Sequence, residues 1–62
     1  MLVMLTSVDR VETAVNAAQV TFVSPATEGT RIRFGEGRTV TVIEPVGEVV
    51  ELLNRTLARE PG

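Results

Sequence analysis

The chain has 62 residues and a formal net charge of −2 at pH 7, and it contains no Cys, His or Lys. One domain spanning residues 1–62 is expected at this length, and without Cys and His there is neither a disulfide nor an ordinary zinc site. The acidic balance, with Phe22 and Phe34 as the only aromatic residues, also argues against nucleic-acid binding, which needs basic surfaces and stacking platforms.

The small size itself predicts self-association. A chain this short buries only about 60% of the surface that its unfolded form exposes, and small domains usually add a disulfide, a metal or a second subunit. Because this sequence has neither Cys nor His, association with a second subunit is the remaining means of stabilisation, and we expect protein partners and a homo-oligomer. No apolar run approaches the roughly 18 residues of a membrane span, and the apolar start lacks the positive charges of a signal peptide. These features predict a cytoplasmic protein without membrane insertion.

Two short strands are predicted at 2–6 and 11–15, joined by a turn at 7–10 and followed by a corner at Asn16. The first strand is a short apolar run with turn-forming flanks, and the second alternates apolar residues with polar or small ones. Asn favours a corner because its side chain bonds to nearby backbone groups. Leu2 and Met4 have two interpretations: they lie in a core strand, or they line an oligomer interface, where adaptable Met is common.

Three further strands are predicted at 19–24, 30–34 and 38–43. In the first of these, Val20 and Phe22 are expected on one face. Pro25 is expected to end that strand, because proline has no N–H to donate to a ladder.

The second and third of these strands form a hairpin around residues 35–37. Gly37 supplies the left-handed residue that a three-residue loop requires at its last position. The register that follows pairs Ile32 with Val40, Arg33 with Thr39 and Arg31 with Thr41. Arg31 and Arg33 then point outward, where they either contact an acidic partner, since Arg is enriched at interface hot spots, or form a plain solvated face.

A helix is predicted over 45–59, with Glu60-Pro61-Gly62 stopping it. Pro45 suits the first helical position, apolar residues follow at helical spacing, and Glu51 with Arg55 forms an i,i+4 ion pair. The fold class is therefore α+β: a small antiparallel β-meander of five strands closed by one C-terminal helix. The predicted core consists of Val20, Phe22, Ile32, Phe34, Val40, Val42, Val46, Val49, Val50, Leu53 and Leu57.

The residues that carry most enzyme chemistry are missing, which predicts a protein that is not an enzyme and that holds no cofactor or metal. A nucleophile has no His or Lys to activate it, and a paired-carboxylate mechanism needs two acids held about 5–9.5 Å apart in a cleft. Gly35-Glu36-Gly37 leads into a strand and not into a helix, so it indicates a hairpin turn and not a phosphate-binding loop.

The order of short motifs along the whole chain resembles the FlbD/SwrD family of short proteins encoded among bacterial flagellar genes. The matching positions are Leu5-Thr6, Val15-Asn16, Val20 to Val23, Pro25, Thr30-Arg31-Ile32, the turn at 35–37, Val40-Thr41-Val42, Glu44 and Glu48-Val49-Val50. This chain has Asp9-Arg10 where the family usually has Asn-Gly, and its helix ends with Arg55 and Arg59 where the family is often Lys-rich. The resemblance implies a non-enzymatic accessory role in flagellar assembly or motor output, and it transfers no binding residues.

The sequence thus favours a small protein-interaction domain similar to FlbD/SwrD accessory or regulatory proteins. The alternative is a self-assembling structural protein, ring-forming or phage-associated, with no flagellar role; similar short proteins also occur in phages. The candidate interaction residues are Arg31, Arg33, Leu2 and Met4.

Overall fold

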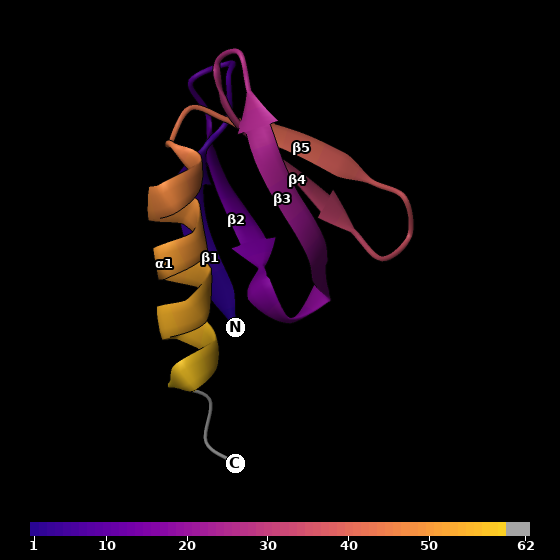
Figure 1. The fold of residues 1–62 in the computed structure, drawn as a ribbon, viewed down its shortest axis with the longest axis vertical. Helices are drawn as coiled ribbons and strands as arrows, with labels where there is room; N and C mark the ends of the chain where they lie inside the picture. The colour runs from indigo at the N-terminus through magenta and orange to yellow at the C-terminus, as the bar shows by residue number, and fades with distance from the viewer. Residues whose placement is uncertain (60–62) are drawn as a thin grey trace.

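The computed structural model describes residues 1–59 and contains five strands, one 3-10 helix and one α-helix (Figure 1). In chain order these are β1 (Leu2–Thr6), β2 (Glu12–Asn16), η1 (Ala17–Gln19), β3 (Val20–Ala26), β4 (Gly29–Phe34), β5 (Thr39–Val42) and α1 (Val46–Ala58). The α+β class, with five antiparallel strands and one C-terminal helix, is therefore confirmed. The expected helix stop at Glu60-Pro61-Gly62 lies outside the described residues.

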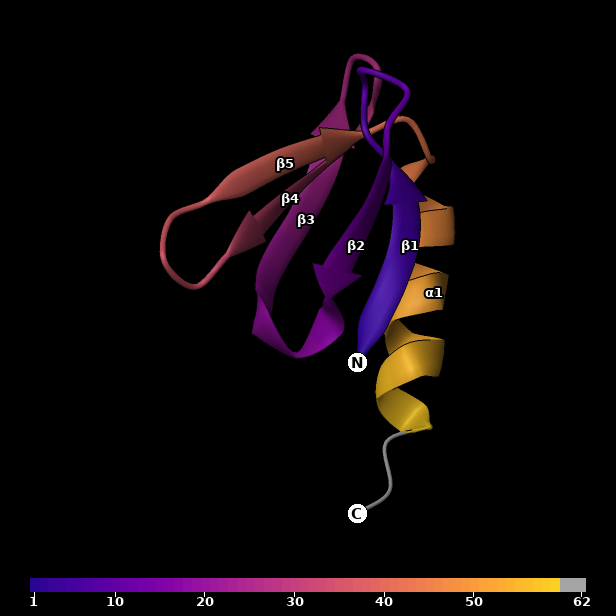
Figure 2. The same ribbon diagram turned by 180° about the vertical axis from the view of Figure 1, so that it is seen from behind.

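The strands form two sheets and not one continuous meander. β1 pairs with β2, while β3, β4 and β5 form a three-stranded sheet. The chain leaves the first sheet through η1, where Asn16 Oδ1 accepts a hydrogen bond from the Ala18 N–H at 3.1 Å, which confirms the predicted corner. The sheets meet again where Ser7 bridges to Val42, and from that point β2 and the β4–β5 hairpin diverge (Figure 2).

The β4–β5 hairpin has the predicted loop and register. The Phe34 N–H donates to the Arg38 C=O at 2.8 Å, and Gly37 takes the left-handed position at φ 81°. The pairs are Ile32 with Val40, Arg33 with Thr39 and Arg31 with Thr41, as expected. Ile32 is completely buried and both arginines are exposed, so the hairpin separates an inner from an outer face.

β3 departs from the predicted alternation because it contains a β-bulge. Val20 pairs with Phe34, but Phe22 pairs with Arg33, so Thr21 is an extra residue on this strand. The Thr21 hydroxyl donates to the Arg33 C=O at 2.9 Å. One extra residue moves the following side chains to the opposite face of a sheet. Phe22 is therefore 51% exposed, and its prediction as a core residue is wrong.

Pro25 does not end β3, which continues to Ala26. Successive residues of a central antiparallel strand direct their backbone N–H and C=O groups alternately toward one neighbouring strand and toward the other. The Phe34 N–H bonds on the β5 side, so the backbone groups of the even-numbered residues of β4 point toward β5. Pro25 pairs with Thr30, whose backbone groups point toward β5, so the two residues exchange no hydrogen bond. The Pro25 nitrogen, which carries no hydrogen, therefore faces the open edge of β3. Proline is tolerated at such edge positions, which explains why the predicted strand end is wrong.

The core lies between α1 and the inner faces of the two sheets, since α1 packs against β1, β3, β4 and η1. Its buried apolar residues are Val3, Leu5, Val15, Ala17, Ile32, Val42, Val49 and Leu53. Three other predicted core residues, Val20, Phe34 and Val40, are half-buried and pack against this cluster. The first hairpin thus contributes buried residues that the predicted core did not include.

The helix buries a narrower stripe than predicted. It begins at Val46, which is half-buried, after Pro45 as the N-cap residue. Val49 and Leu53 form the buried centre of α1. Val50 and Leu57 are 39% and 42% exposed, so their prediction as core residues is wrong, because the buried face of the helix is centred on Val49 and Leu53 and leaves both at its margin.

A polar junction fixes the start of the helix against both sheets. The Thr6 N–H donates to both Glu44 carboxylate oxygens at 3.1 Å. The hydroxyl of Thr30, which is completely buried, donates to the Glu44 C=O at 2.7 Å. Glu44 therefore links β1 and β4 to the segment before α1, and through it the two sheets are hydrogen-bonded to the start of the helix.

Candidate interaction surfaces

The outer face of the three-stranded sheet carries the two arginines singled out in the sequence. Arg31 pairs with Ser24 and Thr41, and Arg33 pairs with Phe22 and Thr39. The Arg33 guanidinium carbon lies 5.8 Å from the centroid of the Phe22 ring, within the range of a cation–π contact. Because these paired side chains include no carboxylate, the face is positive although the chain is acidic.

An apolar groove lies between β3 and α1, and we refer to it as the Phe22 groove. Its volume is about 210 Å³, and it is lined by Ala17, Val20, Phe22, Val23, Val50, Leu53, Asn54 and Leu57. The three wrongly predicted core residues, Phe22, Val50 and Leu57, thus share one surface. The sequence signal for this groove is the apolar stripe of the helix, which is wider than the part of α1 that is buried in the core.

Leu2 and Met4 lie on the outer face of β1. They are 65% and 56% exposed, whereas Val3 and Leu5, which alternate with them, are buried. Strand alternation accounts for this separation, since successive side chains point to opposite faces. The core-strand interpretation of Leu2 and Met4 is therefore wrong, and the interpretation as an oligomer interface stays a prediction.

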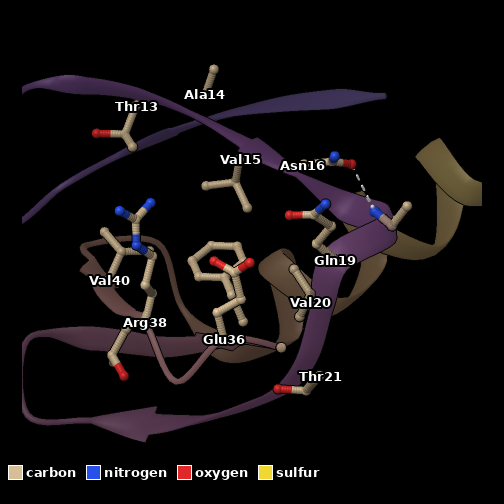
Figure 3. Close-up of a pocket in the computed structure, with 14 residues that line it drawn as sticks. Thr13, Ala14, Val15, Asn16, Gln19, Val20, Thr21, Glu36, Arg38 and Val40 are labelled. Atoms are coloured by element: carbon tan, nitrogen blue, oxygen red, sulfur yellow. Dashed lines mark hydrogen bonds between the residues drawn. The ribbon is translucent and has the colours of Figure 1, made fainter.

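A larger cleft of about 850 Å³ opens between β2 and the β4–β5 hairpin, and we call it the β2 cleft. Its lining residues are Thr13, Ala14, Val15, Asn16, Ala18, Gln19, Val20, Thr21, Phe34, Gly35, Glu36, Arg38, Thr39 and Val40. Figure 3 shows Glu36 and Arg38 reaching into it from the hairpin loop, with Val15 pointing in from β2 and Ala14 pointing away. Sequence reasoning missed this cleft entirely.

The β2 cleft carries little charge. Glu36 is its only carboxylate and Arg38 its only cation, so it lacks the second acid of a paired-carboxylate site and is close to electrically neutral. Among residues 1–59, no group of three or more Asp and Glu side chains is placed to hold a metal ion. The remaining side chains that line the β2 cleft are hydroxyls, amides and apolar groups.

Within the described part of the chain, α1 and η1 are both too short or too polar to cross a membrane. Comparison with protein-family models, with curated proteins and with solved structures found no match for this sequence. Four surfaces of residues 1–59 are candidates for binding: the arginine face, the Phe22 groove, the outer face of β1 and the β2 cleft.

Proposed function

We propose that this protein is a non-enzymatic protein-interaction domain, an accessory or regulatory protein of the FlbD/SwrD kind that works in the cytoplasm. The observation that carries the proposal is the Phe22 groove, where an aromatic ring, Val50 and Leu57 are all exposed beside Arg33. Interface centres are enriched in aromatic residues and Arg, and hot spots concentrate on a few such anchors.

The positive charge beside the Phe22 groove indicates what kind of partner segment the groove would bind. The Arg33 guanidinium lies over the Phe22 ring, and Arg31 lies on the same outer face of β4, so a partner that covers Phe22 also meets positive charge. A segment with an apolar ridge flanked by carboxylates satisfies both, because Arg forms bidentate hydrogen bonds with carboxylates. We therefore assign the Phe22 groove to an acidic, amphipathic segment of a different protein.

The alternative function, a self-assembling structural protein of a ring or phage particle, is supported by a separate observation. Leu2 and Met4 expose two large apolar side chains on neighbouring outward positions of β1. Exposed apolar patches on small proteins often mark association surfaces. In this second proposal the outer face of β1 joins copies of the chain.

The two proposals differ in which variant loses an interaction. A two-hybrid screen against the products of neighbouring genes is expected to give a partner that binds the wild type and fails to bind Phe22→Ser. Val11→Ser is the matched control, since Val11 is 58% exposed but lies outside the groove. A partner that binds Phe22→Ser as well as the wild type would rule out the groove.

The molecular mass of the protein in solution tests the alternative proposal of self-assembly. We expect light scattering after size exclusion, over a dilution series, to give a monomer if the protein is an adaptor for another protein. A multimer that persists on dilution and dissociates in the Leu2→Ser/Met4→Ser double variant would instead establish self-assembly through β1.

A further inference from the structure

One edge of β2 has no strand beside it. The Ser7 N–H donates to the Val11 C=O at 2.9 Å at the start of the β1–β2 ladder. In an antiparallel ladder only alternate pairs are hydrogen-bonded, so the odd-numbered residues of this segment bond to β1. The backbone N–H and C=O groups of Glu12 and Ala14, together with the N–H of Asn16, therefore point toward the opposite edge. The Asn16 C=O belongs to η1, because Asn16 is the N-cap residue of that helix.

This open edge borders the β2 cleft. β1 is the only strand that pairs with β2 among residues 1–59. No backbone hydrogen bond from the turns and loops of that stretch reaches Glu12 or Ala14. Ala14 and Asn16 both line the cleft. Unpaired strand edges are templates for pairing with another extended chain, so the donors and acceptors for such a strand are already in place.

The floor of the cleft is suited to the side chains of an added strand. Val15 is buried and points into the cleft (Figure 3), and Val20, Phe34 and Val40 are half-buried around it. A strand beside β2 presents every second side chain to this floor. Because Glu36 and Arg38 balance each other in charge, selection depends on apolar side chains at alternate positions.

We infer that the β2 cleft binds an extended peptide segment of another protein, which adds as a strand to the open edge of β2 and places alternate apolar side chains against Val20, Phe34 and Val40. Recognition of this type takes affinity from main-chain hydrogen bonds and specificity from pockets for alternate side chains. The inference goes beyond the proposed function, since it concerns a different cavity from the Phe22 groove and a different kind of partner segment.

A single unpaired segment fits the cleft better than a second copy of the chain. In a second copy, β2 is hydrogen-bonded to β1 along its length, so pairing would bring a two-stranded sheet into the cleft. The β4–β5 hairpin stands across the cleft from β2 (Figure 2), and η1 closes one end. A lone strand would bring only one chain into this space.

The test uses two substitutions of Ala14, whose N–H faces the open edge and whose side chain points away from the cleft. Ala14→Pro removes that donor while keeping the bonds to β1, because proline is tolerated where the N–H faces away from the ladder. Ala14→Thr is the matched control, since it keeps the N–H. Random peptides displayed on phage are selected on the wild-type protein, and the enriched peptides are synthesised and titrated by calorimetry.

The expected result is a set of peptides with apolar residues at alternate positions that bind Ala14→Thr like the wild type. Their affinity for Ala14→Pro should fall at least about tenfold, which corresponds to the loss of one well-made hydrogen bond. Absence of enrichment, or equal binding to Ala14→Pro, would overturn the inference. If Ala14→Pro does not fold, hydrogen exchange on the wild type decides: bound peptide must protect the Ala14 and Asn16 amides, and unchanged exchange would refute the inference. None of these outcomes depends on Phe22.

Discussion

At the scale of single residues, Arg10 carries backbone strain in the first hairpin turn. It is the one non-glycine residue in the described range with a positive φ, at 68°, and its N–H donates to the Ser7 C=O at 2.9 Å. The left-handed conformation costs a residue with a Cβ about 1 kcal/mol or more. This is the turn in which the FlbD/SwrD family usually has Asn-Gly, so the structure shows what the glycine of that motif would relieve.

Arg10→Gly is therefore expected to raise the free energy of unfolding by about 1 kcal/mol and Tm by about 4–8 °C. Asp9→Gly is the control: Asp9 has no positive φ to relieve, so glycine adds only unfolded-state entropy and Tm falls. Thermal denaturation followed by circular dichroism measures both. A fall in Tm for both variants would contradict the inference that the Arg10 backbone is strained.

Gly29 and Gly37 both have positive φ but differ in the space around them. A Cβ on Gly29 would lie 2.2 Å from the Val42 backbone oxygen, whereas one on Gly37 meets nothing within 4 Å. Gly29→Ala should therefore lower the free energy of unfolding by about 3 kcal/mol, through strain and backbone displacement, and Gly37→Ala by about 1 kcal/mol. Urea denaturation measures the difference in the free energy of unfolding. Equal losses for the two variants would show that the close approach of the Gly29 backbone to the Val42 backbone does not exclude a Cβ.

At the scale of elements, α1 offers a direct test of which helix face is buried. Leu53 is 7% exposed and Leu57, one turn later, is 42% exposed. Leu53→Asp places an unpaired charge in the core and should unfold the protein or lower its stability by more than about 3 kcal/mol, while Leu57→Asp should cost less than about 1 kcal/mol. Circular dichroism melts distinguish the two. A wild-type melting curve for Leu53→Asp would mean that α1 packs on another face.

The elements were predictable from the sequence wherever local chemistry determines them. The β4–β5 hairpin follows from one glycine and a clean alternation, and the predicted pairing of Ile32 with Val40 is confirmed; so is the Glu51–Arg55 ion pair on α1. The bulge at Thr21 was not predictable, because a bulge is specified by pairing with β4 and leaves no mark on the hydrophobic pattern. The wrong prediction of Phe22 as a core residue follows from the extra residue Thr21.

At the scale of the whole molecule, the candidate sites were less predictable than the fold. The exposure of Arg31, Arg33, Leu2 and Met4 follows from strand alternation. The β2 cleft, however, lies between residues 13–21 and 34–40, and its width depends on how far the two sheets diverge from the Ser7–Val42 bridge. That divergence is set by long-range contacts, such as the Thr6–Glu44 hydrogen bonds across 38 positions of sequence, and no local pattern encodes it.

The bulge in β3 also makes the Phe22 groove tolerant of one particular deletion. Thr21 is the extra residue of the bulge, so a chain that lacks it would keep Val20 opposite Phe34 and Phe22 opposite Arg33, with Phe22 still on the outer face. Regular pairing of every residue of β3, without a bulge, would instead place Phe22 opposite Ile32 and turn it toward the interior. In an alignment of related chains, a one-residue gap at position 21 would therefore mark members that present the aromatic position on the surface without needing a bulge.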